Sequence, residues 1–162
     1  MRLKCLVTAL ALLTPGDFSA ARAQAPASTA ASADQEQAVR TVVGEFGKRL
    51  GQVSVLAPVA MAAAAMDNAY AGYVAPDLLA KWKQSPQLAP GKQTSSPSPE
   101  RIDVVSITPK GRDAFQVAGK VILLTAKERR DGGVFQANPV AITVARRGGK
   151  WLIVEYKETQ SP

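Results

Sequence analysis

The spacing of apolar residues changes once along the chain, at a segment rich in Pro and Ser. Before this segment, apolar side chains recur every three or four residues, as on one face of a helix; they are Val39, Val42, Val43, Phe46, Leu50 and Val53. After it, apolar and polar residues alternate, which is the period of a strand. The pattern therefore predicts helices in the first half of the chain and strands in the second.

The first predicted helix begins near Asp34 and runs toward Val53. Asp is a good N-cap because its carboxylate accepts hydrogen bonds from the free N–H groups of the first turn. Gly44, Gly47 and Gly51 weaken the helix, but they would allow another backbone to approach closely.

Two shorter helices are expected to follow, over residues 59–74 and 77–84. Pro58 and Pro76 stand at their starts, where a missing N–H costs nothing. One apolar face of each helix is marked by Val59, Met66, Tyr70, Tyr73 and Val74 in the first, and by Leu78, Leu79 and Trp82 in the second.

Four strands are expected after Pro99, around residues 102–107, 114–128, 140–144 and 151–156. Turns containing Gly separate them, and Gly119 marks a bulge or bend in the second strand. No strand is visible between the helices. Helices followed by such strands predict an α+β fold, with N-terminal helices packed on a curved antiparallel four-stranded sheet.

Residues 87–99 hold most of the Pro/Ser-rich segment and could be an interdomain linker or a loop within one domain. Too little chain lies on either side for two independent cores, because the helices need the sheet to cover their apolar faces. We therefore expect residues 87–99 to form a loop that connects the helices to the sheet within one domain. Whether this loop closes over the mouth of the curved sheet stays open.

The N-terminus has the features of a secretory signal peptide. Two basic residues precede an apolar run at residues 6–13, and Ala21-Arg22-Ala23 fits a cleavage site. A membrane anchor would need about 20 apolar residues, and Cys5 lies before the run, the wrong place for lipidation.

The predicted organisation is therefore a signal peptide at 1–23, a disordered tether at 24–33, one domain at 34–157 and a tail at 158–162. Removing 1–23 takes away three basic residues and one acidic residue, so the net charge falls from +7 to +5. The mature protein is expected to be exported, periplasmic or secreted, with no transmembrane segment.

After residue 23 the chain contains neither Cys nor His. Zinc and transition-metal sites depend on these residues, and so do Ser-His and Cys-His catalysis. We therefore expect no cofactor, no metal site and no disulfide, and only carboxylates, Lys, Tyr, Ser and Thr remain as catalytic groups.

The last hairpin, Gly149-Lys150-Trp151 and the strand after it, resembles the closing hairpin of the nuclear-transport-factor-2-like superfamily. The likeness covers residues 35–157 and extends to exported bacterial members through segments 46–50, 73–82 and 95–97. It implies a cone-shaped domain with a pocket between the helices and the concave face of the sheet. Enzymes of the superfamily often use Asp and His there; with no His, no catalytic residue carries over.

The function expected is that of an exported, non-catalytic binding domain rather than an enzyme. Its partner would be an envelope protein or a small apolar ligand held in the cone, since relatives serve in type IV secretion systems and in cell-wall enzymes. The residues predicted for the pocket or interface are aromatic: Tyr70, Tyr73, Trp82, Phe115, Trp151 and Tyr156. Ile122 and Leu124 face away from this side, which suggests a homodimer through the outer sheet face.

Two alternatives stay open. A carboxylate-dependent dehydratase or isomerase would use Asp67 or Glu155, which alternates with Trp151 and Ile153, and would need a raised pKa. A binder of anionic envelope polymers would use a basic patch in which two turns meet at one end of the sheet: Arg129, Arg130, Arg146, Arg147 and Lys150. Export disfavours nucleic acid as the partner.

Overall fold

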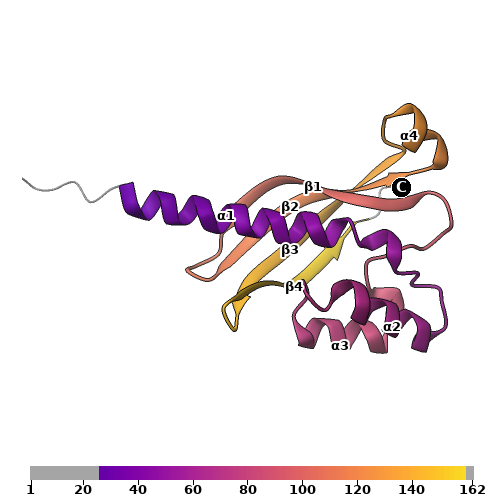
Figure 1. Cartoon of the computed structure of the whole chain (residues 1–162), viewed down its shortest axis with the longest axis horizontal. Helices are drawn as coiled ribbons and strands as arrows, with labels where there is room; N and C mark the ends of the chain where they lie inside the picture. The colour runs from indigo at the N-terminus through magenta and orange to yellow at the C-terminus, as the bar shows by residue number, and fades with distance from the viewer. Residues whose placement is uncertain (1–25, 160–162) are drawn as a thin grey trace, which may run out of the picture.

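The computed structural model describes residues 26–159, and their side chains from Ser32 onward; the predicted signal peptide lies outside the described residues. Within this part, the elements in chain order are α1 (Pro26–Gly47), η1 (Leu50–Gln52), α2 (Val59–Tyr70), α3 (Pro76–Gln84), η2 (Pro86–Leu88), β1 (Ser98–Pro109), β2 (Ala114–Leu124), α4 (Ala126–Asp131), β3 (Gln136–Arg147) and β4 (Lys150–Glu158). The strands pair antiparallel in the order β1-β2-β3-β4, and the sheet is not closed. The predicted α+β fold is confirmed (Figure 1).

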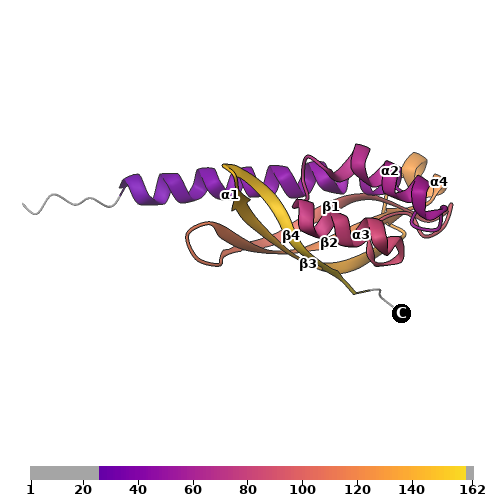
Figure 2. The same cartoon turned by 90° about the horizontal axis from the view of Figure 1, so that it is seen from below.

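α1 runs along one face of the sheet, and its first turns project past the end of the sheet where β1 turns into β2 (Figures 1 and 2). Val43 and Phe46 of this helix are fully buried, as are Val117 of β2, Ile142 of β3 and Ile153 of β4. These side chains belong to one continuous core between the helices and the sheet. The apolar face of the helix and the apolar face of the sheet, each predicted from its own spacing, thus pack against each other in one core.

α1 begins at Pro26, so the predicted start near Asp34 and the predicted disordered tether are wrong for residues 26–33. The reason lies in helix propensity: four of these eight residues are Ala, the best helix former, and Pro is favoured in the first turn. At the other end β4 extends to Glu158, and the Thr159 N–H donates to the Pro139 carbonyl at 2.9 Å. The folded part therefore includes residues predicted to form the tail.

α1 ends at Gly47 rather than running to Val53, and the chain crosses β1 here at very short range. A Cβ on Gly47 would lie 2.6 Å from the backbone N of Ile102, and one on Gly51 would lie 2.8 Å from the Pro99 carbonyl O. The predicted close approach of a backbone is confirmed at these two glycines. Gly44 has no neighbour within 4 Å of the same position.

β2 ends at Leu124, not at residue 128, because Thr125 and Glu128 form a capping box that starts α4. The Lys127 N–H donates to Thr125 Oγ1 at 3.1 Å, and the Thr125 N–H donates to Glu128 Oε2 at 3.0 Å. The sequence carries this signal as Thr-x-x-Glu. α4 contacts the end of β2.

Ile122 and Leu124, expected to leave apolar surface on the outer face, are 3 % and 7 % exposed within the single chain. These two side chains therefore leave no apolar surface for the predicted homodimer to cover. Val59, predicted on the apolar face of α2, is instead exposed.

A bulge in β4 reverses the predicted orientation of Glu155. Thr143 pairs with Glu155 and Val144 with Ile153, so Val154 is an extra residue. Glu155 therefore lies on the opposite face from Ile153, and the prediction that they share a face is wrong. The bulge expected at Gly119 occurs on the paired strand, where the register shifts between Val104 and Ser106.

The segment between α2 and α3 touches the sheet without forming a strand. The Ile153 N–H donates to the Tyr73 carbonyl at 2.8 Å, and the Ala75 N–H donates to the Ile153 carbonyl at 2.9 Å, which gives a single parallel bridge at Val74. Pro76 explains the extended backbone here, since a residue before Pro avoids the helical region. Among the described helices, none has the length and apolarity that crossing a membrane would require.

Candidate ligand-binding site

A pocket of about 570 Å³ opens at the end of the sheet where β2 stops and β3 begins, a size within the range of small-molecule sites. One wall comes from residues 87–99, which run into the start of β1, the floor comes from β2, β3 and β4, and Leu50 contributes from η1. The wall residues are Gln87, Leu88, Ala89, Pro90, Gly91, Gln93, Thr94, Pro97 and Pro99; the floor residues are Val121, Leu123, Gln136, Asn138, Tyr156, Lys157 and Glu158. The segment 87–99 thus forms one wall of the mouth of the sheet.

Hydrogen bonds fix the first half of this wall to the core. The buried Tyr70 hydroxyl donates to the Pro90 carbonyl at 2.7 Å. The Lys92 N–H donates to the Val53 carbonyl at 2.7 Å, and the Val55 N–H donates to the Lys92 carbonyl at 3.1 Å. These bonds hold residues 90–92 against the turn that follows α1.

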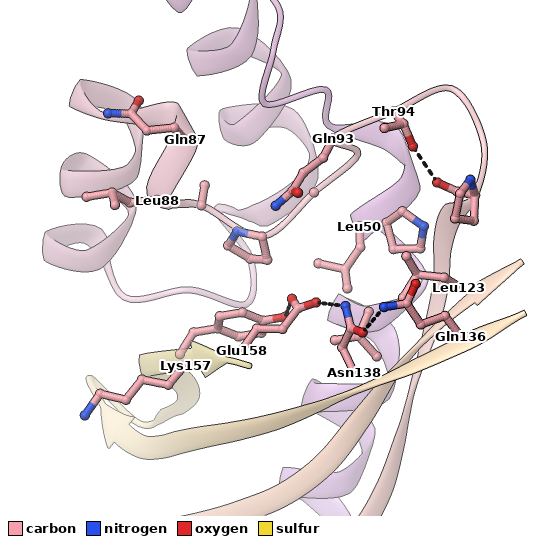
Figure 3. Close-up of a pocket in the computed structure, with 17 residues that line it drawn as sticks. Leu50, Gln87, Leu88, Gln93, Thr94, Leu123, Gln136, Asn138, Lys157 and Glu158 are labelled. Atoms are coloured by element: carbon pink, nitrogen blue, oxygen red, sulfur yellow. Dashed lines mark hydrogen bonds between the residues drawn. The ribbon is translucent and has the colours of Figure 1, made fainter. Parts of the chain in front are cut away.

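Gly91 fits at this point because nothing larger would. A Cβ there would lie 2.7 Å from the Val53 carbonyl O. Beyond it the wall is exposed and closes with a local turn, in which the Thr94 hydroxyl donates to the Pro97 carbonyl at 3.0 Å (Figure 3). One half of the wall is anchored and the other half faces solvent.

A chain of polar side chains crosses the floor of the pocket (Figure 3). Gln136 Nε2 donates to Asn138 Oδ1 at 2.8 Å, Asn138 Nδ2 donates to Glu158 Oε1 at 2.9 Å, and the Tyr156 hydroxyl donates to Glu158 Oε2 at 2.7 Å. Residues 136 and 138, and residues 156 and 158, share a face because side chains alternate along each strand. We call these four residues the floor network.

The carboxylate of Glu158 is held by neutral donors. No ion pair within residues 26–159 includes it. The adjacent Lys157 directs its ammonium away from the pocket (Figure 3) and pairs with Glu155 at 2.8 Å. The floor therefore carries a negative charge that no cationic side chain of this part of the chain neutralises.

Tyr156 is the hydroxyl donor of the network. Burial, and then the negative charge of Glu158, hold the pKa of Tyr156 well above its usual value. The phenol is accordingly protonated at neutral pH and donates to the carboxylate.

Of the six aromatic residues predicted for the pocket, only Tyr156 lines it. Tyr70 and Trp82 pack with Tyr156 around Phe46, with ring centroids 4.9 to 6.4 Å apart, so they belong to the core at the base of the site. The bonded, buried hydroxyl of Tyr70 positions the wall. Phe46, the centre of this aromatic cluster, was expected only as a core residue.

The other three predicted aromatic residues lie elsewhere. Tyr73 is half-buried, and the Arg49 guanidinium carbon lies 4.5 Å from its ring centroid. Phe115 and Trp151 stack edge to face at 5.4 Å, and Phe115 borders a second, shallower hollow of about 420 Å³ with Arg112 and Ser32.

Gln136, Asn138 and Glu158 are the pocket residues that sequence reasoning missed. The third strand was expected to begin near Val140 and the last to end at Tyr156, so both polar ends were read as turn or tail. The available signal was the two-residue alternation of Gln136 and Asn138 with Ala137 and Pro139 upstream of Val140. Its phase is opposite to that of Val140 and Ile142, so the polar residues take the core-facing positions.

The predicted basic patch does not exist as one surface. Arg129 and Arg130 lie in α4, whereas Arg146, Arg147 and Lys150 lie at the β3–β4 turn, and β3 separates the two groups along its whole length (Figure 1). Arg129 also pairs with Glu100 at 2.9 Å and donates to Ser98 Oγ at 2.6 Å.

Neither carboxylate of the predicted catalytic alternative lines the pocket. Asp67 is on the surface, 2.5 Å from Lys83. Glu155 lies on the outer face, where hydrogen bonds from Lys157 and Thr143 lower its pKa, the opposite of the shift that the alternative needs. No cluster of three or more acidic, His or Cys side chains suited to a metal occurs in the part of the chain that the structure describes.

Comparison of the chain with protein-family models, with curated proteins and with solved structures finds no match.

Proposed function

We propose that this chain is an exported, non-catalytic binding domain whose pocket holds a small ligand with an apolar part and a cationic or hydrogen-bond-donating group. The observation that carries the proposal is the floor network, which ends in a carboxylate without a cationic partner among residues 26–159. The pocket opens on the sheet, as the nuclear-transport-factor-2-like resemblance implies, but its other wall is the 87–99 segment rather than the helices α1, α2 and α3.

The chemistry of the lining defines the ligand more closely than the sequence did. Leu88, Pro90 and Pro97 offer apolar contact along the wall, as a purely apolar ligand would need. Glu158 lies opposite them and only accepts hydrogen bonds, so it favours an ammonium, guanidinium or hydroxyl group. We therefore extend the expected small apolar ligand to one that is amphipathic.

A pair of charge-removing variants on one strand tests this function. Alkylamines and the corresponding alkanes are titrated by calorimetry into the wild type, Glu158→Gln and Glu155→Gln. A charge-assisted hydrogen bond contributes about 1.5–3 kcal/mol, so Glu158→Gln is expected to weaken amine binding roughly 10- to 100-fold. Glu155→Gln, the same change on the outer face of β4, is expected to leave it unchanged.

Equal affinities in the two variants would show that the pocket carboxylate does not recognise the ligand. If the wild type binds an alkane and the corresponding amine with equal affinity, the ligand is purely apolar and the proposed recognition of a cationic group is wrong. Thermal unfolding of each variant confirms that the fold is kept.

A further inference from the structure

We infer that the end of the sheet opposite α4 is a binding surface for anionic phospholipid membranes. Two turns meet there, the one between β1 and β2 and the one between β3 and β4. The Arg146 N–H donates to the Asp113 carbonyl at 2.8 Å, which joins the two turns directly. Both point to the same end of the molecule as the N-terminus of α1, away from α4 (Figures 1 and 2).

This basic end carries five exposed cationic side chains: Lys110, Arg112, Arg146, Arg147 and Lys150. Within residues 26–159 none of them forms an ion pair, whereas Lys48, Lys83, Arg101 and Arg129 do so elsewhere on the domain. None donates a side-chain hydrogen bond to the described part of the chain either. The charge of Lys110 also acts on Glu155 of the outer face, and the charges of the other four are directed to solvent and to whatever approaches this end.

Acidic residues reduce this charge but do not cancel it. Asp113 lies in the β1–β2 turn, and Asp34 and Glu36 lie on the neighbouring stretch of α1. The five cations come from two turns that together contain one carboxylate, so the excess is positive at the tip.

A flat membrane surface that meets the overhanging start of α1 stays within electrostatic reach of the basic turns. Ser32 borders the hollow that Arg112 lines, and Pro26 is six residues further toward the N-terminus. At 1.5 Å per residue, α1 extends about 9 Å past this point. That overhang is close to the Debye length of about 8 Å at physiological salt, so the charges of the turns are only partly screened from a surface that touches the start of α1. The Arg and Lys side chains also extend across part of the gap.

A negatively charged leaflet attracts the five cations of these two turns, at about 1 kcal/mol for each basic residue near the surface.

Single-stranded nucleic acid fits this surface less well. Such partners need aromatic platforms on which bases stack. The aromatic side chains nearest these turns, Phe115 and Trp151, are stacked on each other instead, and Phe115 is buried.

Co-sedimentation of the predicted mature chain, residues 24–162, with vesicles tests the inference. The vesicles contain phosphatidylcholine with or without phosphatidylglycerol, and the variants are Arg146→Glu/Arg147→Glu and, as a matched control, Lys127→Glu/Arg130→Glu on α4. Both variants change the net charge equally. Each basic residue near the surface contributes roughly a fivefold gain in partitioning, so the first variant should lose at least about tenfold on anionic vesicles and the control should stay within about twofold.

A second variant at the basic end, Arg112→Glu/Lys150→Glu, should reproduce the loss and guards against a folding defect confined to one turn. Wild-type retention should also fall as salt rises. Equal losses at the two ends would show a net-charge effect and overturn the inference, and so would retention that ignores phosphatidylglycerol. Binding to polyphosphate or duplex DNA without binding to anionic vesicles would assign this end to a soluble polyanion and would equally overturn it.

Discussion

Tyr70→Phe removes a single hydroxyl, and it tests whether the pocket wall is held as the structure shows. The Tyr70 hydroxyl is buried and donates to the Pro90 carbonyl, itself in a buried residue of the wall. The variant keeps the ring and its packing against Phe46 and Trp82. It therefore leaves the Pro90 carbonyl without this donor and changes little else.

Leaving a buried acceptor unsatisfied costs about 1–3 kcal/mol. For a domain of this size, 1 kcal/mol corresponds to roughly 4 °C in Tm, so we expect a fall of about 4–12 °C. Urea unfolding followed by Trp fluorescence measures the free energy, because the ring centroid of Trp82 lies 6.1 Å from that of Tyr70. Hydrogen exchange gives a local measure, and the Lys92 amide should lose protection as the wall loosens.

Tyr73→Phe is the matched control, since the same atom is removed from a half-buried ring whose hydroxyl makes no hydrogen bond to residues 26–159. Its cost should stay within about 0.5 kcal/mol. If the two variants unfold at the same urea concentration and the Lys92 amide keeps its protection, the anchoring of the wall through Tyr70 is refuted.

Two further predictions concern packing and pH. Gly47→Ala forces a Cβ against the backbone N of Ile102, so it should lower the free energy of urea unfolding by about 1–3 kcal/mol. Gly44→Ala, where the new Cβ meets no neighbour, should raise that free energy by about 0.5–1 kcal/mol. A stabilising effect of Gly47→Ala would contradict the close crossing. Burial raises the pKa of both Tyr70 and Tyr156 above the usual tyrosine value of about 10, so their contribution to stability is fully present below pH 10 and is lost as the pH rises through the folded-state pKa. Denaturation above pH 10 should thus be steeper for the wild type than for Tyr70→Phe, and identical slopes would contradict it.

The sequence specified the layers of the fold well, because two different periods carry that information. Val43 and Phe46 follow the helical period, and Val117 and Ile142 follow the strand period; all four are buried in the shared core. What periodicity cannot show is an interruption of the period. The extra residue Val154 reverses the face of Glu155, and nothing in the composition of β4 marks it.

The predicted end of the second strand was wrong although the sequence contains the signal that ends it. Thr125 and Glu128 spell a capping box, yet the apolar run before them favoured a longer strand. The predicted basic patch was wrong because the strand topology separates its two groups of basic residues. In a meander, the β2–β3 connection and the β3–β4 turn lie at opposite ends of β3, so Arg130 and Arg147 could not meet.

The pocket was the least predictable part, since its wall (residues 87–99) and its floor (residues 121–158) are distant in the sequence and meet only through the pairing of β1 to β4. Of the aromatic side chains predicted for the pocket, Tyr70 and Trp82 instead form the core at its base, and only Tyr156 lines it. The polar floor network is assembled from Asn138 in β3 and Glu158 in β4, and the strand register alone brings these side chains within hydrogen-bond distance.

The central claim is that a small amphipathic ligand binds between the 87–99 segment and the floor network. The most direct test is amide chemical-shift mapping of the wild type during titration with an alkylamine. We predict that shifts concentrate at residues 88–94, 136–138 and 156–158, and saturate together. Shifts centred on residues 111–115 at the second hollow, or no saturable shift at any alkylamine concentration, would contradict the claim.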